Sequence, residues 1–385
     1  MPAPRPFTVA VPDAVLTDLR ERLARARFPD EPPGAGWQFG SELGYVKALT
    51  TYWRERYDWR RWEAELNRFR QFTAPVAGID VHFIHEEGRG PKPMPLLLSH
   101  GWPASVWEFH SILPMLTDPA RFGGDPKDAF TVVAPSLPGY GFSFAPGQPR
   151  FGVPEIADVF GSLMTDTLGY ARYGAQGGDW GAAASTQLAM LAPERLVGIH
   201  LNFVLAGPPQ DGSDPFEGVT PEERAALAAT EGFESEETGY QRIQGTRPQT
   251  LAYGLNDSPA GLAGWIVEKF RAWSDCKGHV ESRFTKDELL THITIYWVTQ
   301  TINSSTRLYC ETMRGGRWGM TQHCVTVPTG CAIFPGEMIQ PPRRWAERYY
   351  PIRRWTRMAS GGHFAALEEP DALVDEIRAF FRELR

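Results

Sequence analysis

The sequence predicts an α/β fold: a doubly wound, mostly parallel sheet that carries an inserted helical cap and follows an N-terminal helical extension. From Met94 onward, short apolar runs alternate with helical patterns, as expected where helices cover both faces of a parallel sheet. The alternation stops after Phe203 and returns near Val325, and the intervening segment is polar and helical in pattern. This interruption indicates an insertion into one large domain, although a length of 385 residues also leaves room for two domains.

Residues 1–90 form the predicted extension. Leu16, Leu19 and Leu23 share one face of a helix that begins at Asp13. A second helix has an apolar stripe of its own, and a Gly-containing turn separates two strand-like runs that indicate a hairpin. The expected elements are a strand at 7–11, a helix from residue 13, a helix at 41–57, and hairpin strands at 71–76 and 79–85.

The predicted core comprises residues 91–205 and 323–385, and the predicted cap comprises residues 206–322. A Gly- and Pro-rich linker at 207–213 leads into the cap. Parallel strands joined by helices require crossovers, which are right-handed in nearly all proteins. The core strands are expected at 95–99, 130–134, 170–176, 196–202, 325–328, 331–334 and 355–358, and the core helices at 105–117, 154–168, 182–191 and 370–383.

Charge and composition exclude several classes of protein. The net charge of −7 argues against a nucleic-acid partner, and 42% apolar residues argue against global disorder. The four cysteines form no CxxC pair, so we expect no disulfide framework and a cytoplasmic location. The N-terminus lacks an apolar signal region, and no run of about 18 apolar residues occurs, so no membrane anchor is expected. His82 and His85, three apart on a strand, point to opposite faces, so no metal site is expected there.

The segment Gly177-Gly178-Asp179-Trp180-Gly181 has the pattern of a nucleophile elbow, the sharp turn that lifts one side chain above an α/β sheet. Glycines flank such a turn because a side chain there would collide with the strained backbone. Many hydrolases place serine at the central position, whereas this chain places Asp179. A carboxylate suits attack on an sp³ carbon and gives an ester that water can hydrolyse. Taken alone, the motif also fits a surface Gly-Asp turn.

A second motif, His100-Gly-Trp-Pro103, follows the apolar run at 95–99. In the α/β-hydrolase arrangement this loop supplies one backbone N–H of the oxyanion hole, and the residue after the nucleophile supplies the other. The N–H groups of Trp102 and Trp180 are therefore the candidates to hold a developing oxyanion. An ordinary turn at a strand end is the alternative.

The general base is expected near the C-terminus, in the chain order nucleophile, acid, histidine. His363 lies there, in Gly361-Gly-His-Phe-Ala365, and Glu337 lies at the end of the preceding strand. Glu337 would hold the His363 ring in the tautomer whose other nitrogen deprotonates water. Glu347 falls within a predicted helix, and Glu368, with its neighbour Glu369, fits the start of the last helix better.

The chain resembles the microsomal-type epoxide hydrolase family, an α/β-hydrolase family, almost from end to end. The resemblance implies a soluble bacterial member, because the membrane-bound members carry an N-terminal anchor that this sequence lacks. The matching segments are Arg5-Pro-Phe, Val11-Pro-Asp-Ala, the motifs around Trp102, Asp179 and His363, Pro138-Gly-Tyr-Gly-Phe-Ser143, Tyr240-Gln-Arg-Ile-Gln-Gly-Thr-Arg-Pro-Gln-Thr250, Leu255-Asn-Asp-Ser-Pro259, Trp265-Ile-Val-Glu-Lys-Phe270, Tyr296-Trp-Val-Thr299 and Val327-Pro-Thr-Gly330.

The resemblance also implies the roles of the site residues. Asp179 would open the epoxide, and His363 with its partner Glu337 would activate the hydrolytic water. Two cap tyrosines of the family, matched here by Tyr240 and Tyr309, would bind the epoxide oxygen. A phenol suits an incipient alkoxide, whose conjugate acid is weaker still. No cofactor or metal is implied.

Other activities fit parts of the pattern. Haloalkane dehalogenases use the same Asp and His logic but stabilise a halide, commonly through Trp or Asn N–H donors, and need no paired tyrosines. Asp179 at the elbow disfavours a serine esterase, and a non-catalytic binding protein would be free to lose the three acid–base residues. The expected substrate is a small apolar or aromatic epoxide. Detoxification, secondary-metabolite biosynthesis and a homodimeric state all remain open, and the Arg-, Ala-, Gly- and Pro-rich composition points to a GC-rich bacterium.

Overall fold

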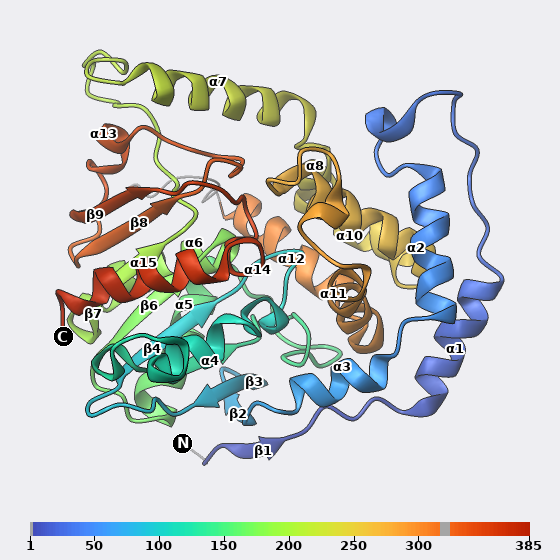
Figure 1. Ribbon diagram of the computed structural model, residues 1–385, viewed down its shortest axis with the longest axis horizontal. Helices are drawn as coiled ribbons and strands as arrows, with labels where there is room; N and C mark the ends of the chain where they lie inside the picture. The colour runs from blue at the N-terminus through green and yellow to red at the C-terminus, as the bar shows by residue number, and fades with distance from the viewer. Residues whose placement is uncertain (1–2, 316–323) are drawn as a thin grey trace.

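One nine-stranded sheet runs through the part of the chain that the computed structural model describes, residues 3–315 and 324–385 (Figure 1). The strand order is β1-β2-β3-β5-β4-β6-β7-β8-β9. Pairs from β1 to β5 are antiparallel, and pairs from β5 through β4 to β9 are parallel. The mostly parallel α/β fold predicted from the sequence is therefore confirmed. The strands are β1 Arg5–Phe7, β2 Gln71–Val76, β3 Ile79–Glu86, β4 Met94–Ser99, β5 Phe130–Pro135, β6 Tyr173–Gly177, β7 Leu196–Leu201, β8 Thr329–Ile333 and β9 Ile352–Arg357.

Both faces of the central strands are buried, which explains their continuous apolar runs. On β4, Leu97 packs into one hydrophobic cluster, while Leu96 and Leu98 pack into a second cluster on the other face. Parallel sheets are stable in this arrangement because helices cover each face. The helices between and after these strands are α4 Ile112–Thr117, α5 Val153–Ser162, α6 Asp179–Leu191, α13 Arg343–Ala346, α14 Ala365–Glu368 and α15 Pro370–Arg382.

Two of the predicted core elements are wrong in detail. The helix expected at 105–117 divides into the 3₁₀ turn Val106–Phe109 and α4. Pro114 has no N–H for the carbonyl of His110, and the His110 ring bonds the Trp107 carbonyl (2.9 Å), so the helix is interrupted there. The strand expected at 325–328 does not form, because Val325 N–H donates to the Tyr349 carbonyl (2.8 Å) and β8 starts only at Thr329.

The N-terminal extension contains α1 Asp13–Ala24, α2 Leu43–Glu55 and α3 Trp59–Leu66. The strand expected at 7–11 is wrong, because β1 ends at Phe7. Beyond it, the N–H groups of Val9 and Val11 donate to side chains near the end of α3, namely Asn67 (2.9 Å) and Glu63 (2.7 Å). Sequence reasoning missed α3. Side chains in and just after α3 accept the backbone hydrogen bonds of this extended segment, which a neighbouring strand would otherwise accept.

The described part of the predicted cap, residues 206–315, consists of helices joined by turns, and the predicted boundary at 322 and 323 lies outside the described residues. The helices are α7 Pro221–Glu236, α8 Gly239–Thr246, α9 Pro248–Leu255, α10 Pro259–Trp273, α11 Lys286–Thr299 and α12 Ile302–Arg314. Helices α8, α10, α11 and α12 of the insertion lie between the sheet and helices α1 and α2 of the extension, whereas α7 runs along the top of the view, above β9 (Figure 1). Within the described ranges, no helix is long and apolar enough to cross a membrane.

Candidate active site

The turn between β6 and α6 places Asp179 in a left-handed conformation, with φ at 46°. Non-glycine residues adopt this region rarely, and such strain clusters at functional positions. The flanking glycines are required by space: a Cβ on Gly181 would lie 1.8 Å from the Ser99 carbonyl oxygen, and one on Gly177 would lie 2.3 Å from the Gly181 backbone. The backbone therefore has the close packing that the elbow motif predicts.

The Asp179 carboxylate faces two of the other predicted site residues. Its Oδ1 accepts a hydrogen bond from the N–H of Trp102 (2.7 Å), and its Oδ2 lies 3.5 Å from Nε2 of His363. The side chain is 16% exposed, so it is shielded from most solvent. One oxygen is thus held by the loop after β4, and the other is directed towards a base.

His363 and Glu337 come together where two loops lie side by side. A parallel bridge joins Gly336 to Gly362, next to the two residues. Nδ1 of His363 lies 2.9 and 3.0 Å from the two oxygens of Glu337, and the His363 backbone N–H donates to the Trp273 carbonyl (2.9 Å). This arrangement fixes the ring with Nε2 towards Asp179.

The charges around His363 determine its protonation. Burial lowers the pKa of the imidazole, but the carboxylates of Glu337 and Asp179 raise it, and the net result lies well above the ordinary value. The free site therefore favours an imidazolium between two carboxylates.

The other acidic residues near Glu337 and His363 in the sequence bond groups other than the His363 ring. Glu347 is exposed and pairs with Arg343 (2.7 Å). Glu368 accepts hydrogen bonds from the backbone N–H groups of Asp275 (2.8 Å) and Phe364 (3.0 Å). Glu369 pairs with Arg283, a half-buried arginine of the helical insertion (2.8 Å). Among these acids, the geometry joins Glu337 to the His363 ring.

Tyr240 on α8 and Tyr309 on α12 lie against the residue that holds Asp179. The Tyr240 ring stacks on the Trp102 ring with centroids 5.4 Å apart, and the Tyr309 ring meets it edge-on at 5.9 Å. The two tyrosine rings are 5.8 Å apart. Burial raises the pKa of both hydroxyls, and the charge of Asp179 raises it further, so both tyrosines remain protonated donors at neutral pH.

The two tryptophans proposed for the oxyanion hole occupy different positions. The backbone N–H of Trp102 already bonds the Asp179 carboxylate. Trp180 is the second residue of α6, where backbone N–H groups have no acceptor within the helix. Its ring packs edge-on against Tyr309 at 4.7 Å. A role for the Trp180 N–H at a developing oxyanion stays a prediction.

Sequence reasoning missed two residues that border the site. Trp273 ends α10, and besides accepting the His363 N–H it packs its ring 5.3 Å from the imidazole. Glu108 lies in the 3₁₀ turn after the Trp102 loop, and burial raises its pKa to about 8. The signal in the sequence was its place five residues after Pro103, the end of the tryptophan–proline motif. No group of three or more His, Cys, Asp or Glu within residues 3–315 and 324–385 is arranged to hold a metal ion.

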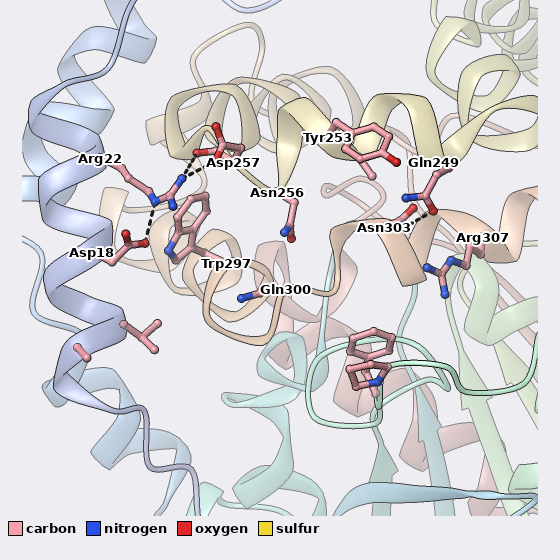
Figure 2. Close-up of a pocket in the computed structure, with 15 residues that line it drawn as sticks. Asp18, Arg22, Gln249, Tyr253, Asn256, Asp257, Trp297, Gln300, Asn303 and Arg307 are labelled. Carbon is pink, nitrogen blue, oxygen red and sulfur yellow. Dashed lines mark hydrogen bonds and ion pairs between the residues drawn. The ribbon is translucent and has the colours of Figure 1, made fainter.

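A separate surface hollow of about 820 Å³ lies among α1, α9, α11 and α12 (Figure 2). Arg22 closes one end by bonding Asp18 (2.7 Å) and Asp257 (2.5 Å), and Asn303 donates to Gln249 (2.9 Å) inside it. None of the predicted site residues lines this hollow. The candidate active site is instead the buried group around Asp179.

Comparison with known proteins gives results for both the sequence and the structure. Residues 4–109 match the family described as epoxide hydrolase N terminus, and residues 94–243 match the family described as alpha/beta hydrolase fold. A protein of Stigmatella aurantiaca (strain DW4/3-1), named as a candidate epoxide hydrolase, is 45% identical over 385 residues, covering 99% of this chain and 85% of that protein.

Two further relatives are similar over a comparable length. Epoxide hydrolase 1 of Sus scrofa is 38% identical over 402 residues, covering 98% of this chain and 88% of that protein. The crystal structure of juvenile hormone epoxide hydrolase from the silkworm Bombyx mori has a TM-score of 0.90 at 31% identity and covers 100% of this chain and 95% of that one. The likeness therefore extends over the extension, the core and the helical insertion.

Proposed function

The chain belongs to the epoxide hydrolase family, and we propose that it converts an epoxide and water into a vicinal diol through an ester formed on Asp179. The observation that carries the proposal is the placement of the Asp179 carboxylate. One oxygen accepts the Trp102 N–H at 2.7 Å, and the other faces His363 at 3.5 Å. The two tyrosines packed on Trp102 supply hydroxyl donors at the same site.

In the first step, Asp179 attacks a carbon of the strained ring, and the carbon–oxygen bond opens. The oxygen gains negative charge as this bond breaks, and Tyr240 and Tyr309 donate hydrogen bonds to it. Donors aimed at developing charge lower the barrier because the charge is absent in the bound substrate. Burial that keeps the tyrosines protonated suits them to this role.

After alkylation the opened oxygen takes up the proton that His363 loses. In the second step, His363 takes a proton from water, and the hydroxide attacks the carboxyl carbon of the ester. The bond between that carbon and the substrate oxygen then breaks, the departing oxygen takes the proton brought in by the hydroxide, and the diol leaves with the Asp179 carboxylate restored. The N–H groups of Trp102 and Trp180 would hold the resulting oxyanion. Ester formation removes the charge of Asp179, which is one of the influences that raise the pKa of His363 in the free site. The imidazole therefore loses its proton more readily after alkylation, when a base is needed, while Glu337 keeps it oriented.

We assign the helical insertion, residues 206–322, the role of a cap, and the extension, residues 1–90, the role of holding the cap on the core. Ser41 of the extension donates to the Gly264 carbonyl of α10 (2.6 Å), and the Tyr57 hydroxyl lies 3.0 Å from that of Thr291 on α11. These bonds support a fixed position for α10 and α11, two helices of the insertion.

A dehalogenase reaction is the second candidate, because the indole N–H of Trp102 is buried without an acceptor among the described residues. A halide could accept from this N–H. The test is to incubate the protein with styrene oxide and, separately, with 1-bromohexane, measuring diol by chromatography and bromide by ion analysis. We expect diol from the epoxide and no enzymatic bromide release. Bromide release without diol would replace the proposed activity with the dehalogenase.

A further inference from the structure

Lys269, on α10, is a buried cation beside one of the proposed tyrosines. Its side chain is 6% exposed, and its Nζ lies 4.7 Å from the centroid of the Tyr240 ring. The same nitrogen lies 5.7 Å from the ring of Trp273. Glu268, the preceding residue, forms an ion pair with it. Moving an ammonium group out of water costs free energy. The ion pair with Glu268 could also form at the surface, so the buried position of Lys269 requires a further favourable interaction.

The carboxylates near Lys269 and Tyr240 come from separate parts of the chain. Glu268 belongs to α10, and Glu237 follows the end of α7, near the start of the helix that carries Tyr240. Burial raises the pKa of Glu237, and the charge of Glu268 raises it further. Burial raises the pKa of the Tyr240 hydroxyl, and the charge of Asp179 on α6 raises it further. The ring of Tyr240 has the ammonium of Lys269 over its face.

We propose that Lys269 is a positioning residue that strengthens Tyr240 as a hydrogen-bond donor to the opening epoxide. This inference rests on the proposed function. As the Tyr240 hydroxyl shares its proton with the epoxide oxygen, negative charge spreads from the phenolic oxygen into the ring. A cation over the ring face is attracted more strongly to that ring than to the neutral phenol. The ammonium therefore stabilises the transition state more than the bound substrate, and it acts through Tyr240 without contacting substrate.

The first test removes the charge and keeps the length of the side chain. Lys269→Met should slow the alkylation of Asp179, measured by rapid quench and intact mass, by about threefold to thirtyfold, the range of a buried cation–π contact. Hydrolysis of the ester should change little, because His363 and Glu337 are untouched. Lys269→Arg keeps a cation and should restore most of the rate. Lys286→Met is the matched control, because Lys286 pairs with Glu281 on another part of the cap, and its alkylation rate should equal that of wild type.

A double-mutant cycle separates this role from simple packing. Tyr240→Phe keeps a ring for the ammonium but removes the hydroxyl. Lys269→Met should therefore add almost no further slowing in the Tyr240→Phe background, and its full effect in the Tyr309→Phe background. If Lys269→Met does not fold, Lys269→Gln serves in the same cycle. Equal slowing in both backgrounds would overturn the role of Lys269 and leave the proposed function standing.

The substrate gives a second readout that a structural role would not change. The oxygen of 1,2-epoxyhexane becomes a more basic alkoxide than that of epichlorohydrin, so its opening depends more on a strong donor. Lys269→Met should slow alkylation by epoxyhexane more than alkylation by epichlorohydrin, and an equal loss on both would contradict the proposal. If wild type forms no ester, the proposed function fails, and the role of Lys269 is overturned with it. If wild type forms the ester but Tyr240→Phe alone does not slow alkylation, the donor role of Tyr240 and the role of Lys269 are overturned while the ester route stands.

Discussion

The core half and the cap half of the candidate site hold their side chains by different means. In the core half, Asp179, His363 and Glu337 follow strand ends, and each has a hydrogen bond to the backbone: the Trp102 N–H, the Trp273 carbonyl and the Met338 N–H (2.7 Å). In the cap half, Tyr240 and Tyr309 lie on helices and are placed chiefly by ring packing. A hydrogen bond is lost when either its donor or its acceptor atom is removed. The packing of an aromatic ring remains when its hydroxyl is removed, because most of its contacts involve the ring carbons.

This difference predicts how each half responds to conservative substitution. Changes in the core half should stop one chemical step, because the group removed is the reactant or the base. Each change in the cap half should slow the first step only partly, because in the proposed mechanism two hydroxyls share one oxygen. The experiments below test this contrast, starting with the largest expected effect.

His363→Gln should separate the two steps most clearly. Steady-state turnover should fall by about four orders of magnitude or more, as for loss of the base in other hydrolases, because water is no longer deprotonated. Asp179 should still be alkylated, so an ester should accumulate and add the mass of the epoxide in intact mass spectrometry. His279→Gln, at an exposed position of the cap, is the control and should turn over normally. Absence of ester in His363→Gln would show that the histidine also takes part in the first step.

The cap half is tested by removing hydroxyls and keeping rings. Tyr240→Phe and Tyr309→Phe should each slow alkylation by about one to two orders of magnitude, because a hydrogen bond to developing charge contributes roughly 1.5–3 kcal/mol. The double variant should fall well below either single variant, while thermal unfolding changes little. Tyr253→Phe is the control, since this side chain is 72% exposed and lies away from the site. A double variant that opens epoxide at the wild-type rate would remove both tyrosines from the mechanism.

Glu337→Gln tests the support of the base. An amide can still bond Nδ1 but does not stabilise an imidazolium, so hydrolysis of the ester should slow by about tenfold to a hundredfold, less than for His363→Gln. Single-turnover decay of the ester is the measurement. Glu347→Gln is the control, because Glu347 is paired at the surface. Equal hydrolysis in Glu337→Gln and wild type would mean that another group supports His363.

The last expected effect is on stability instead of activity and concerns Glu108, a buried carboxyl near the core half. Burial raises its pKa from 4.5 to about 8, with Asp179 adding to the increase and His363 opposing it. Between these pH values the folded protein keeps a proton that the unfolded chain has lost, so stability falls as pH rises. Glu108→Gln should remove this decline, gaining up to ~1.4 kcal/mol per pH unit relative to wild type between about pH 5 and 8. Urea unfolding at several pH values measures it.

The control for this experiment is Glu87→Gln, whose side chain is 74% exposed. Its unfolding free energy should keep the same pH dependence as wild type. If Glu108→Gln also keeps the wild-type dependence, the carboxyl ionises at its ordinary pH in the folded protein.

The two halves also differ in how far they follow from the sequence. Asp179, His363 and Glu337 could be located because the order of strands and loops fixes where a nucleophile, an acid and a base fall along the chain. The two tyrosines were identified through family resemblance, since helical periodicity marks a buried face without assigning it chemistry. Lys269 lay in a segment that matched the family, but its distance from the Tyr240 ring depends on how α8 and α10 pack.

The errors in the fold have the same origin. Local pattern predicted one helix at 105–117, but a ring bond from His110 and the missing N–H of Pro114 divide it. A strand was expected at 7–11, where side chains of the unpredicted region around α3 take the hydrogen bonds instead. In each case a competing side-chain partner, rather than intrinsic propensity, decided the structure.

The central claim is that Asp179 forms the ester, and isotope transfer in a single turnover tests it most directly. With enzyme in excess over styrene oxide in H₂¹⁸O, water should attack the carboxyl carbon of the ester, so ¹⁸O should enter the Asp179 side chain. Peptide mass spectrometry of the segment containing Asp179 should show a gain of one ¹⁸O, and the diol formed in that turnover should carry none. Label in the diol with an unlabelled Asp179 would mean that water attacks the epoxide directly, and would contradict the account.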